Sequence, residues 1–142
     1  MTFKAALAAC ALAGGLMAGS LAPRLEARQT PSGWQLPADA ASKKSPLTVD
    51  EKVLAMGKAV YKDKCGRCHG PSGLGDGPDA DPDVRDEMNL TAAKMAAENP
   101  DGVVFNKVQN GRRRPKMPAF KDELTEQQIW SVVAYVQTLR KK

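Results

Sequence analysis

The sequence predicts an all-α fold of three to five helices joined by long loops. Three segments carry apolar residues at helical spacing, and each is bounded by a capping or stop signal. No segment alternates apolar and polar residues with the period of a strand. The 29 residues from 70 to 98 are rich in glycine and proline, which predicts a loop with at most one helical turn, at 92–97. A chain of 142 residues has room for one such domain.

The first predicted helix begins at Thr48 and runs to about Lys64. Thr48 and Glu51 have the spacing of a capping box, in which each side chain satisfies the other residue's backbone N–H. The face that this helix turns inward consists of Val53, Gly57, Val60 and Tyr61.

Two more helices are predicted after the long loop. Asn99-Pro100 supplies a cap residue followed by proline at the first helical position, and this short helix ends at Asn110-Gly111. Thr125 and Gln128 form a capping box at the start of the last helix. Its apolar stripe consists of Ile129, Val132, Val133, Val136 and Leu139.

Residues 1–27 have the pattern of a secretory signal peptide. Lys4 is the only charge before an 18-residue apolar run over 5–22, and the candidate cleavage points follow Ala22 and Ala27. The alternative is an uncleaved anchor, because 18 apolar residues are just enough to cross a bilayer. We therefore expect a periplasmic protein, or one on the outer face of the cytoplasmic membrane and associated with it through the N-terminus.

Residues 28–47 predict an extended linker or strap, and residues 48–142 the folded domain. The strap is rich in proline, alanine and serine and has no helical period. Trp34 is its one aromatic residue, and we expect it to pin the strap to the domain. The domain itself has few aromatic residues for so much loop, so we expect a group other than side chains to fill its centre.

Cys65-Gly66-Arg67-Cys68-His69 is a C-x-x-C-H sequence, the attachment signature of a c-type haem. Two thiols at this spacing add to the two vinyl groups of one porphyrin, and the adjacent histidine reaches the iron. A redox dithiol would call for a βαβ context, and a structural zinc for four ligands where residues 28–142 offer three. A Cys65–Cys68 disulfide would leave the small core unexplained. The motif therefore predicts one covalent haem c.

Met117 is the candidate for the second axial ligand. It stands between Pro115 and Pro118, whose rings stiffen the backbone on both sides and exclude a helix. The alternative is an open or water-filled distal site. Of the other methionines of residues 28–142, Met56 is interpreted as a residue on the face of the first helix. Gap filling is the ordinary role for Met88 and Met95, which lie in the loop.

From Thr48 to Arg140, which is 93 of the 142 residues, the chain resembles the small bacterial class I cytochromes c. The resemblance implies a class I cytochrome c fold wrapped around one haem, with His69 as proximal and Met117 as distal ligand. It is carried by Gly57-x-x-x-Tyr61, Cys65-Gly66-Arg67-Cys68-His69-Gly70, Gly73-Leu74-Gly75-Asp76-Gly77-Pro78, Asn110-Gly111, Lys116-Met117-Pro118-Ala119-Phe120 and Trp130-x-x-Val133-Ala134-Tyr135-Val136.

The same resemblance implies further roles by position. Pro78 would offer its carbonyl to the Nδ1–H of the proximal histidine and so fix the orientation of the ring. Gly57 and Tyr135 would mark the crossing of the first and last helices. Arg112 and Arg113 lie where a haem propionate can be met.

The charges of the domain fall into two groups. The formal net charge of the chain is +5. The basic group lies around the expected haem edge and comprises Lys62, Lys64, Arg67, Arg112, Arg113, Arg114 and Lys116, whereas the acidic group comprises Asp76, Asp79, Asp81, Asp83, Asp86 and Glu87. This pattern predicts a basic face that docks redox protein partners with acidic contact surfaces, the alternative being two solvated faces. A single short arginine run without interleaved aromatic residues does not favour nucleic acid.

These features predict an electron carrier and not an enzyme. A haem with histidine and methionine ligands would pass single electrons between periplasmic or membrane partners, for example in a respiratory chain. One alternative is a haem subunit of a larger dehydrogenase or respiratory complex. The other is a gas-binding haem protein with an open distal site.

Overall fold

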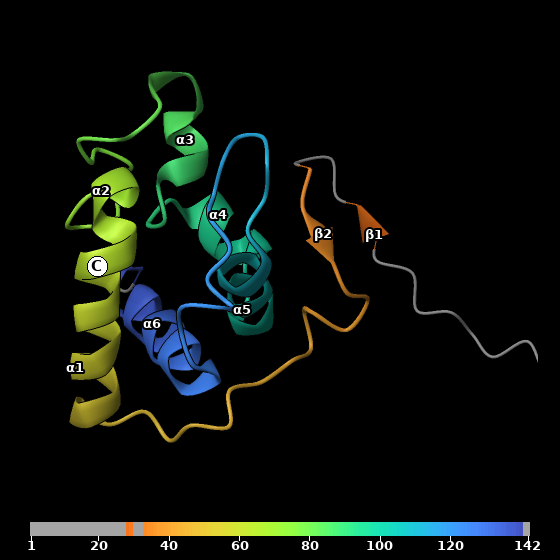
Figure 1. Ribbon diagram of the computed structural model, residues 1–142, viewed down its shortest axis with the longest axis vertical. Coiled ribbons are helices and arrows are strands. Elements are labelled where there is room, and N and C mark those ends of the chain that lie inside the picture. Colours follow the sequence, from red (N-terminus) through yellow and green to blue (C-terminus); the bar gives the residue numbers. More distant parts are fainter. Residues whose placement is uncertain (1–27, 30–32, 141–142) are drawn as a thin grey trace, which may run out of the picture.

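The computed structural model describes residues 28–29 and 33–140, and the predicted signal peptide or anchor at residues 1–27 lies outside these described residues. The domain is helical, as expected, and a short antiparallel ribbon precedes it (Figure 1). In the described residues no helix is long and apolar enough to span a membrane. The elements are β1 (Arg28–Gln29), β2 (Gln35–Leu36), α1 (Glu51–Val60), the π-helix η1 (Tyr61–Cys65), α2 (Gly66–His69), the 3₁₀-helix η2 (Pro82–Val84), α3 (Arg85–Met88), α4 (Ala93–Glu98), α5 (Asp101–Asn110) and α6 (Glu126–Leu139).

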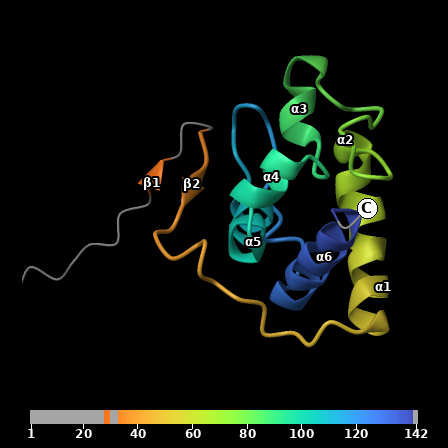
Figure 2. The same cartoon turned by 180° about the vertical axis from the view of Figure 1, so that it is seen from behind.

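The crossing of α1 and α6 forms the base of the domain (Figures 1 and 2). At Gly57 the backbone of α6 comes so close that an added Cβ would lie 2.0 Å from the carbonyl oxygen of Ser131. The rings of Tyr61 and Tyr135 meet beside this point, with centroids 5.3 Å apart. All five residues of the apolar stripe on α6 are buried. The predicted crossing at Gly57 and Tyr135 is therefore present.

Two of the three predicted helix starts are corrected by the structure. The cap of α1 is Asp50, whose side chain accepts the backbone N–H of Val53, and not Thr48. Pro100 occupies the N-cap of α5, one position earlier in the helix than predicted. Both errors are small because neighbouring polar or proline residues offer competing starts. At α6 the predicted capping box of Thr125 and Gln128 is confirmed.

The first helix continues beyond Lys64 as far as His69, through the π-helical segment η1. A π-helix inserts an extra residue in the turn and rotates everything that follows about the helix axis, which is why it often occurs at functional sites. Here it ends at Cys65 and is followed directly by α2, which carries His69. If α1, η1 and α2 are counted as one continuous helix, the described residues contain five helices: this one, α3, α4, α5 and α6.

The long loop between α2 and α5 has more regular structure than predicted, because η2 and α3 precede the expected turn at α4. It folds back on itself beside the haem motif: the backbone N–H of Gly75 donates to the carbonyl of His69 at 2.9 Å, and that of Leu90 to Gly73 at 2.8 Å. The end of α3 is thereby brought next to α2.

Candidate functional site

A cavity of about 790 Å³ lies at the centre of the domain, a volume in the range of small-molecule and cofactor sites. Segments far apart in the sequence contribute to its wall: the strap, η1, α2, α5, the 111–117 hairpin and α6. Its apolar lining includes Tyr61, Leu90, Val104, Val108, Val132 and Val136. The sequence predicted that side chains alone would not fill the centre of the domain, and this cavity lies there.

The structure brings four of the predicted site residues to the cavity wall and leaves three outside it. Cys65, His69, Arg112 and Met117 line the cavity. Outside the lining are Cys68, which is partly buried in α2, and the exposed residues Pro78 and Arg113.

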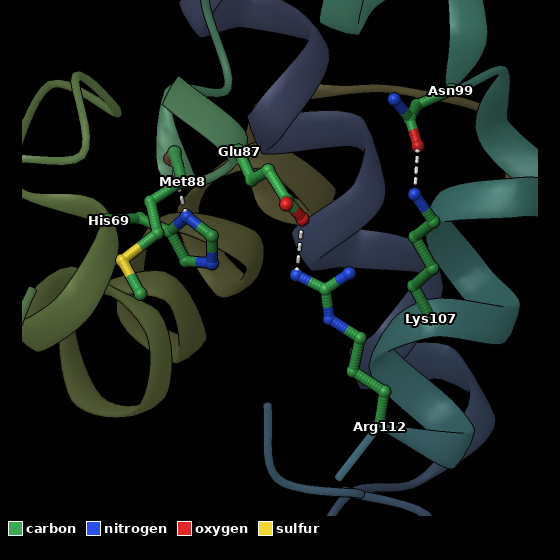
Figure 3. A network of polar contacts seen from close by, with 6 residues as sticks. All are labelled: His69, Glu87, Met88, Asn99, Lys107 and Arg112. Atoms are coloured by element: carbon green, nitrogen blue, oxygen red, sulfur yellow. Dashed lines mark hydrogen bonds and ion pairs between the residues drawn. The ribbon is translucent and has the colours of Figure 1, made fainter. Parts of the chain in front are cut away.

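His69 is oriented by the carbonyl of Met88, and not by that of Pro78. The distance from Nδ1 to this oxygen is 2.7 Å (Figure 3). The cause of the correction is the return of the long loop, which places the end of α3 beside the imidazole. Pro78 is exposed, and the N–H of the adjacent Asp79 donates to the carbonyl of Arg67.

This hydrogen bond also fixes the tautomer of His69. Because a carbonyl can only accept, Nδ1 carries the proton and Nε2 keeps a free lone pair. In Figure 3 Nε2 points away from Met88, to the side of Arg112. Burial lowers the pKa of His69, against the opposing effect of the Met88 carbonyl, so the ring is a neutral imidazole, the form that ligates a metal.

Cys65 and Cys68 are not joined by a disulfide. Burial, with smaller contributions from Cys68 and Asp63, raises the pKa of Cys65 to about 12. A thiol with such a pKa is protonated at neutral pH, unlike the thiolate of a redox-active dithiol. The environment of Cys65 therefore agrees with a structural attachment point and disfavours a thiol-exchange site.

Met117 is held by a tight hairpin that follows α5. Its backbone N–H donates to the carbonyl of Arg112 at 3.0 Å, and its own carbonyl accepts the N–H of Arg112 at 2.9 Å. The hairpin begins at Gly111, whose φ of +59° and close approach to the carbonyl of Met117 both require glycine. Met117 is partly buried, and of the methionines in the described residues only Met117 and Met95 line the cavity.

Cationic side chains line part of the cavity. The side chain of Arg112 is 8% exposed and forms an ion pair with Glu87 at 2.6 Å (Figure 3). Lys107 donates to the side-chain oxygen of Asn99 at 2.5 Å, and burial, followed by the charge of Arg112, lowers its pKa to about 8. Arg140 donates to the backbone carbonyls of Leu90 and Asn99.

Lys107 and Arg140 are site residues that the sequence interpretation missed. A signal for Lys107 was present: it stands four residues after Val103 and three after Val104, on the face of α5 that is otherwise apolar. A charge on such a face needs a polar or anionic partner. No comparable signal marks Arg140, because a basic residue at the end of a helix is ordinary.

The basic and acidic groups are less separate than the sequence suggested. Arg67 and Asp79 form a two-pronged ion pair, and Arg112 pairs with Glu87, so each pair joins one group to the other. Lys64 pairs with Glu123 at 3.0 Å. These contacts neutralise part of the basic face that was expected around the haem edge.

Comparison with known proteins identifies the family of this chain. The pattern of the cytochrome c family matches residues 54–140, which include Cys65, Cys68, His69 and Met117. The chain belongs to the cytochrome c family. Membership implies a covalent haem c attached at the C-x-x-C-H sequence and a role in electron transfer. The class of fold and of cofactor predicted from the sequence is thereby confirmed.

Two solved structures are similar to this cytochrome. The KustC0563 c-type cytochrome is 27% identical and covers 60% of this chain and 98% of its own, with a TM-score of 0.47. A chain of the Kuenenia stuttgartiensis reducing HAO-like protein complex Kustc0457/Kustc0458 is 26% identical and covers 74% of this chain, with a TM-score of 0.54. The match extends over 50% of that second chain, so this cytochrome corresponds to about half its length.

The residues of this cytochrome fit a haem. The cavity offers an imidazole nitrogen, a thiol and a thioether from separate elements, apolar walls for the porphyrin, and cations for its carboxylates. Cys65 and His69 are already in place on the wall, and their positions follow from η1 and from the bond to Met88.

Proposed function

We propose that this cytochrome is a single-haem electron-transfer protein in which His69 and Met117 ligate the iron and Cys65 and Cys68 form the two thioether bonds. The observation that carries the proposal is the convergence of His69, Met117 and Cys65 on one cavity of cofactor size. When bound, haem c supplies a one-electron couple between ferric and ferrous iron.

The residues have distinct tasks in this proposal. The Met88 carbonyl keeps the proton on Nδ1 of His69, so that Nε2 is available to the iron and more basic. The hairpin of Met117 holds the thioether in place, which favours ligation in both oxidation states. Arg112 and Lys107 supply positive charge on the cavity wall, where we place the propionates. No residue is required to move a proton or a substrate.

We further propose that the chain is exported and exchanges electrons with redox proteins in the periplasm or at the membrane. The basis is the leader-like pattern of residues 1–27. The similarity to a chain of a protein complex favours a second candidate, in which this cytochrome works as a docked haem subunit.

N-terminal sequencing and native mass of the purified protein distinguish these two candidates. A chain that starts near Arg28 and elutes alone supports a free carrier. A chain that retains Lys4, or copurifies in fixed ratio with an oxidoreductase, supports the docked subunit.

The visible absorption spectrum of haem-loaded protein is the direct test of ligation. We expect low-spin spectra in both oxidation states and the charge-transfer band of a methionine–ferric iron bond in the oxidised protein. The reduced protein should resist carbon monoxide. A high-spin spectrum with ready carbon monoxide binding would instead establish the gas-binding alternative, and protein without haem would refute both.

Replacing Met117 with alanine is expected to open the sixth coordination position while the haem stays attached. The charge-transfer band should disappear, and the reduced variant should bind carbon monoxide. The reduction potential should fall, because methionine ligation raises it. Absorption spectroscopy with and without carbon monoxide measures these changes.

Met95→Ala is the matched control, because Met95 also lines the cavity from a different element, α4. Its spectrum should be that of the wild type. If Met95→Ala loses the band and Met117→Ala keeps it, the distal ligand has been assigned to the wrong methionine.

A further inference from the structure

The strap contributes to the cavity although it lies outside the matched family domain. The family pattern begins at residue 54, yet Trp34 and Leu36 are part of the cavity wall. Trp34 is 6% exposed, whereas both of its chain neighbours, Gly33 and Gln35, are exposed. An indole so fully buried between two exposed neighbours is held by the domain that it covers.

The strap is fixed to the domain at a second place, along α5. An added Cβ at Gly102 would lie 2.2 Å from the carbonyl oxygen of Ala40 and 2.6 Å from that of Lys43, so strap and helix are in backbone contact. The ammonium group of Lys43 lies over the ring of Phe105, 3.8 Å from its centroid. The strap therefore contacts the domain at two places, at Trp34 and at residues 40–43.

The indole ring of Trp34 makes cation–π contacts with two cationic side chains of the cavity wall. The ammonium of Lys107 lies 4.6 Å from the ring centroid, and the guanidinium carbon of Arg112 lies 4.5 Å from it. Such cations are attracted to the face of an indole, and more strongly where water is excluded. Because Lys107 and Arg112 repel each other, the common ring offsets part of the cost of holding both at the same wall.

We propose that Trp34 is a positioning residue of the cofactor site: it closes the cavity beside Lys107 and Arg112 and holds both cations against the bound haem. The inference rests on the proposed function in one respect, namely that the occupant of the cavity is haem.

Closure at this wall has a defined consequence for electron transfer. Water stabilises the ferric state, which carries one more positive charge, and nearby cations destabilise it. A tryptophan that excludes water and keeps two cations in place therefore raises the reduction potential by both effects. Its removal is expected to lower the potential, because water enters and the two cations are no longer held in place; Glu87 pairs with Arg112 and neutralises part of its charge.

The first experiment measures the reduction potential of haem-loaded Trp34→Ala. We expect the ratio of oxidised to reduced protein at a fixed applied potential to rise about tenfold, which is 59 mV for a one-electron couple. Trp34→Phe keeps an aromatic face and should restore most of the wild-type potential. Lys44→Ala, at an exposed position of the strap, should leave the potential unchanged. A wild-type potential in Trp34→Ala, or an equal fall in Trp34→Phe, would overturn the proposal.

The second experiment uses the wild-type protein and so does not depend on whether a variant folds. The chain contains two tryptophans, and of these Trp34 lines the cavity whereas Trp130 does not. Proton NMR of ferric and ferrous protein reports how near each indole N–H lies to the paramagnetic iron. We expect the resonance of Trp34 to shift between the two states several-fold more than that of Trp130. An equal or smaller shift for Trp34 refutes the proposal. Absence of attached haem is recognised beforehand in the visible spectrum and refutes the proposed function instead.

Discussion

Replacing both Cys65 and Cys68 with alanine is expected to abolish covalent haem and, with it, the folded domain. The cavity of about 790 Å³ occupies the centre of the domain. At about 24 cal/mol per Å³, an empty cavity of this size corresponds to a penalty on the order of 20 kcal/mol. Even a third of that, if water fills the remainder, reaches the roughly 5–15 kcal/mol by which domains are stable.

Haem staining after a denaturing gel measures covalent attachment, and far-ultraviolet circular dichroism measures the loss of helix. Arg67→Ala is the matched control, because Arg67 lies between the two cysteines but is exposed and pairs with Asp79 at the surface. This control should retain haem and most of its helix. Covalent haem in the double variant would show that the attachment site lies elsewhere, and a helical haem-free domain would show that the side chains suffice as a core.

The parts of the site that could be predicted from the sequence are those whose chemistry depends on local spacing. The C-x-x-C-H sequence fixes the attachment residues within five positions, and the Thr125 capping box fixes the start of α6. Gly57 could be placed because the resemblance supplied its partner on α6. In each case the informative residues are close in sequence or belong to a known pattern.

The parts that could not be predicted depend on tertiary contacts that leave no trace in residue type. Every residue has a backbone carbonyl, so nothing in the sequence distinguishes that of Met88 from that of Pro78 as the acceptor for His69. The fold of the 70–98 loop decides between them. Likewise, the contact of Trp34 with Lys107 and Arg112 joins residues that are 73 and 78 positions apart in the sequence.

The π-helical segment is an intermediate case. A helix ahead of the haem motif could be predicted, but apolar spacing does not reveal an inserted residue in the turn at Tyr61–Cys65. The hydroxyl of Tyr61 donates to the carbonyl of Gly70 at 2.7 Å, which ties the start of the π segment to the end of α2. This tertiary bond contributes to the orientation of Cys65 and His69.

Gly57→Ala is expected to destabilise the haem-loaded domain by about 3 kcal/mol or more, which is at the upper end for overpacking. The added methyl group would lie 2.0 Å from the Ser131 carbonyl oxygen and 2.9 Å from Cβ of Tyr135, and both belong to α6. Neither atom can rotate aside, so α1 and α6 must separate. For a domain of this size the melting temperature should fall by roughly 10–25 °C.

The sign of the change in stability distinguishes a steric clash at the helix crossing from an effect of helix propensity. Alanine is favoured over glycine within a helix by about 1 kcal/mol, so propensity alone would make the substitution stabilising. Gly66→Ala is the matched control, because Gly66 is also helical and an added Cβ there has its nearest contact at 3.6 Å. Denaturant unfolding of both variants should give a loss for Gly57→Ala and no loss for Gly66→Ala. If Gly57→Ala is as stable as the wild type, α1 and α6 do not make the close backbone contact described at this position.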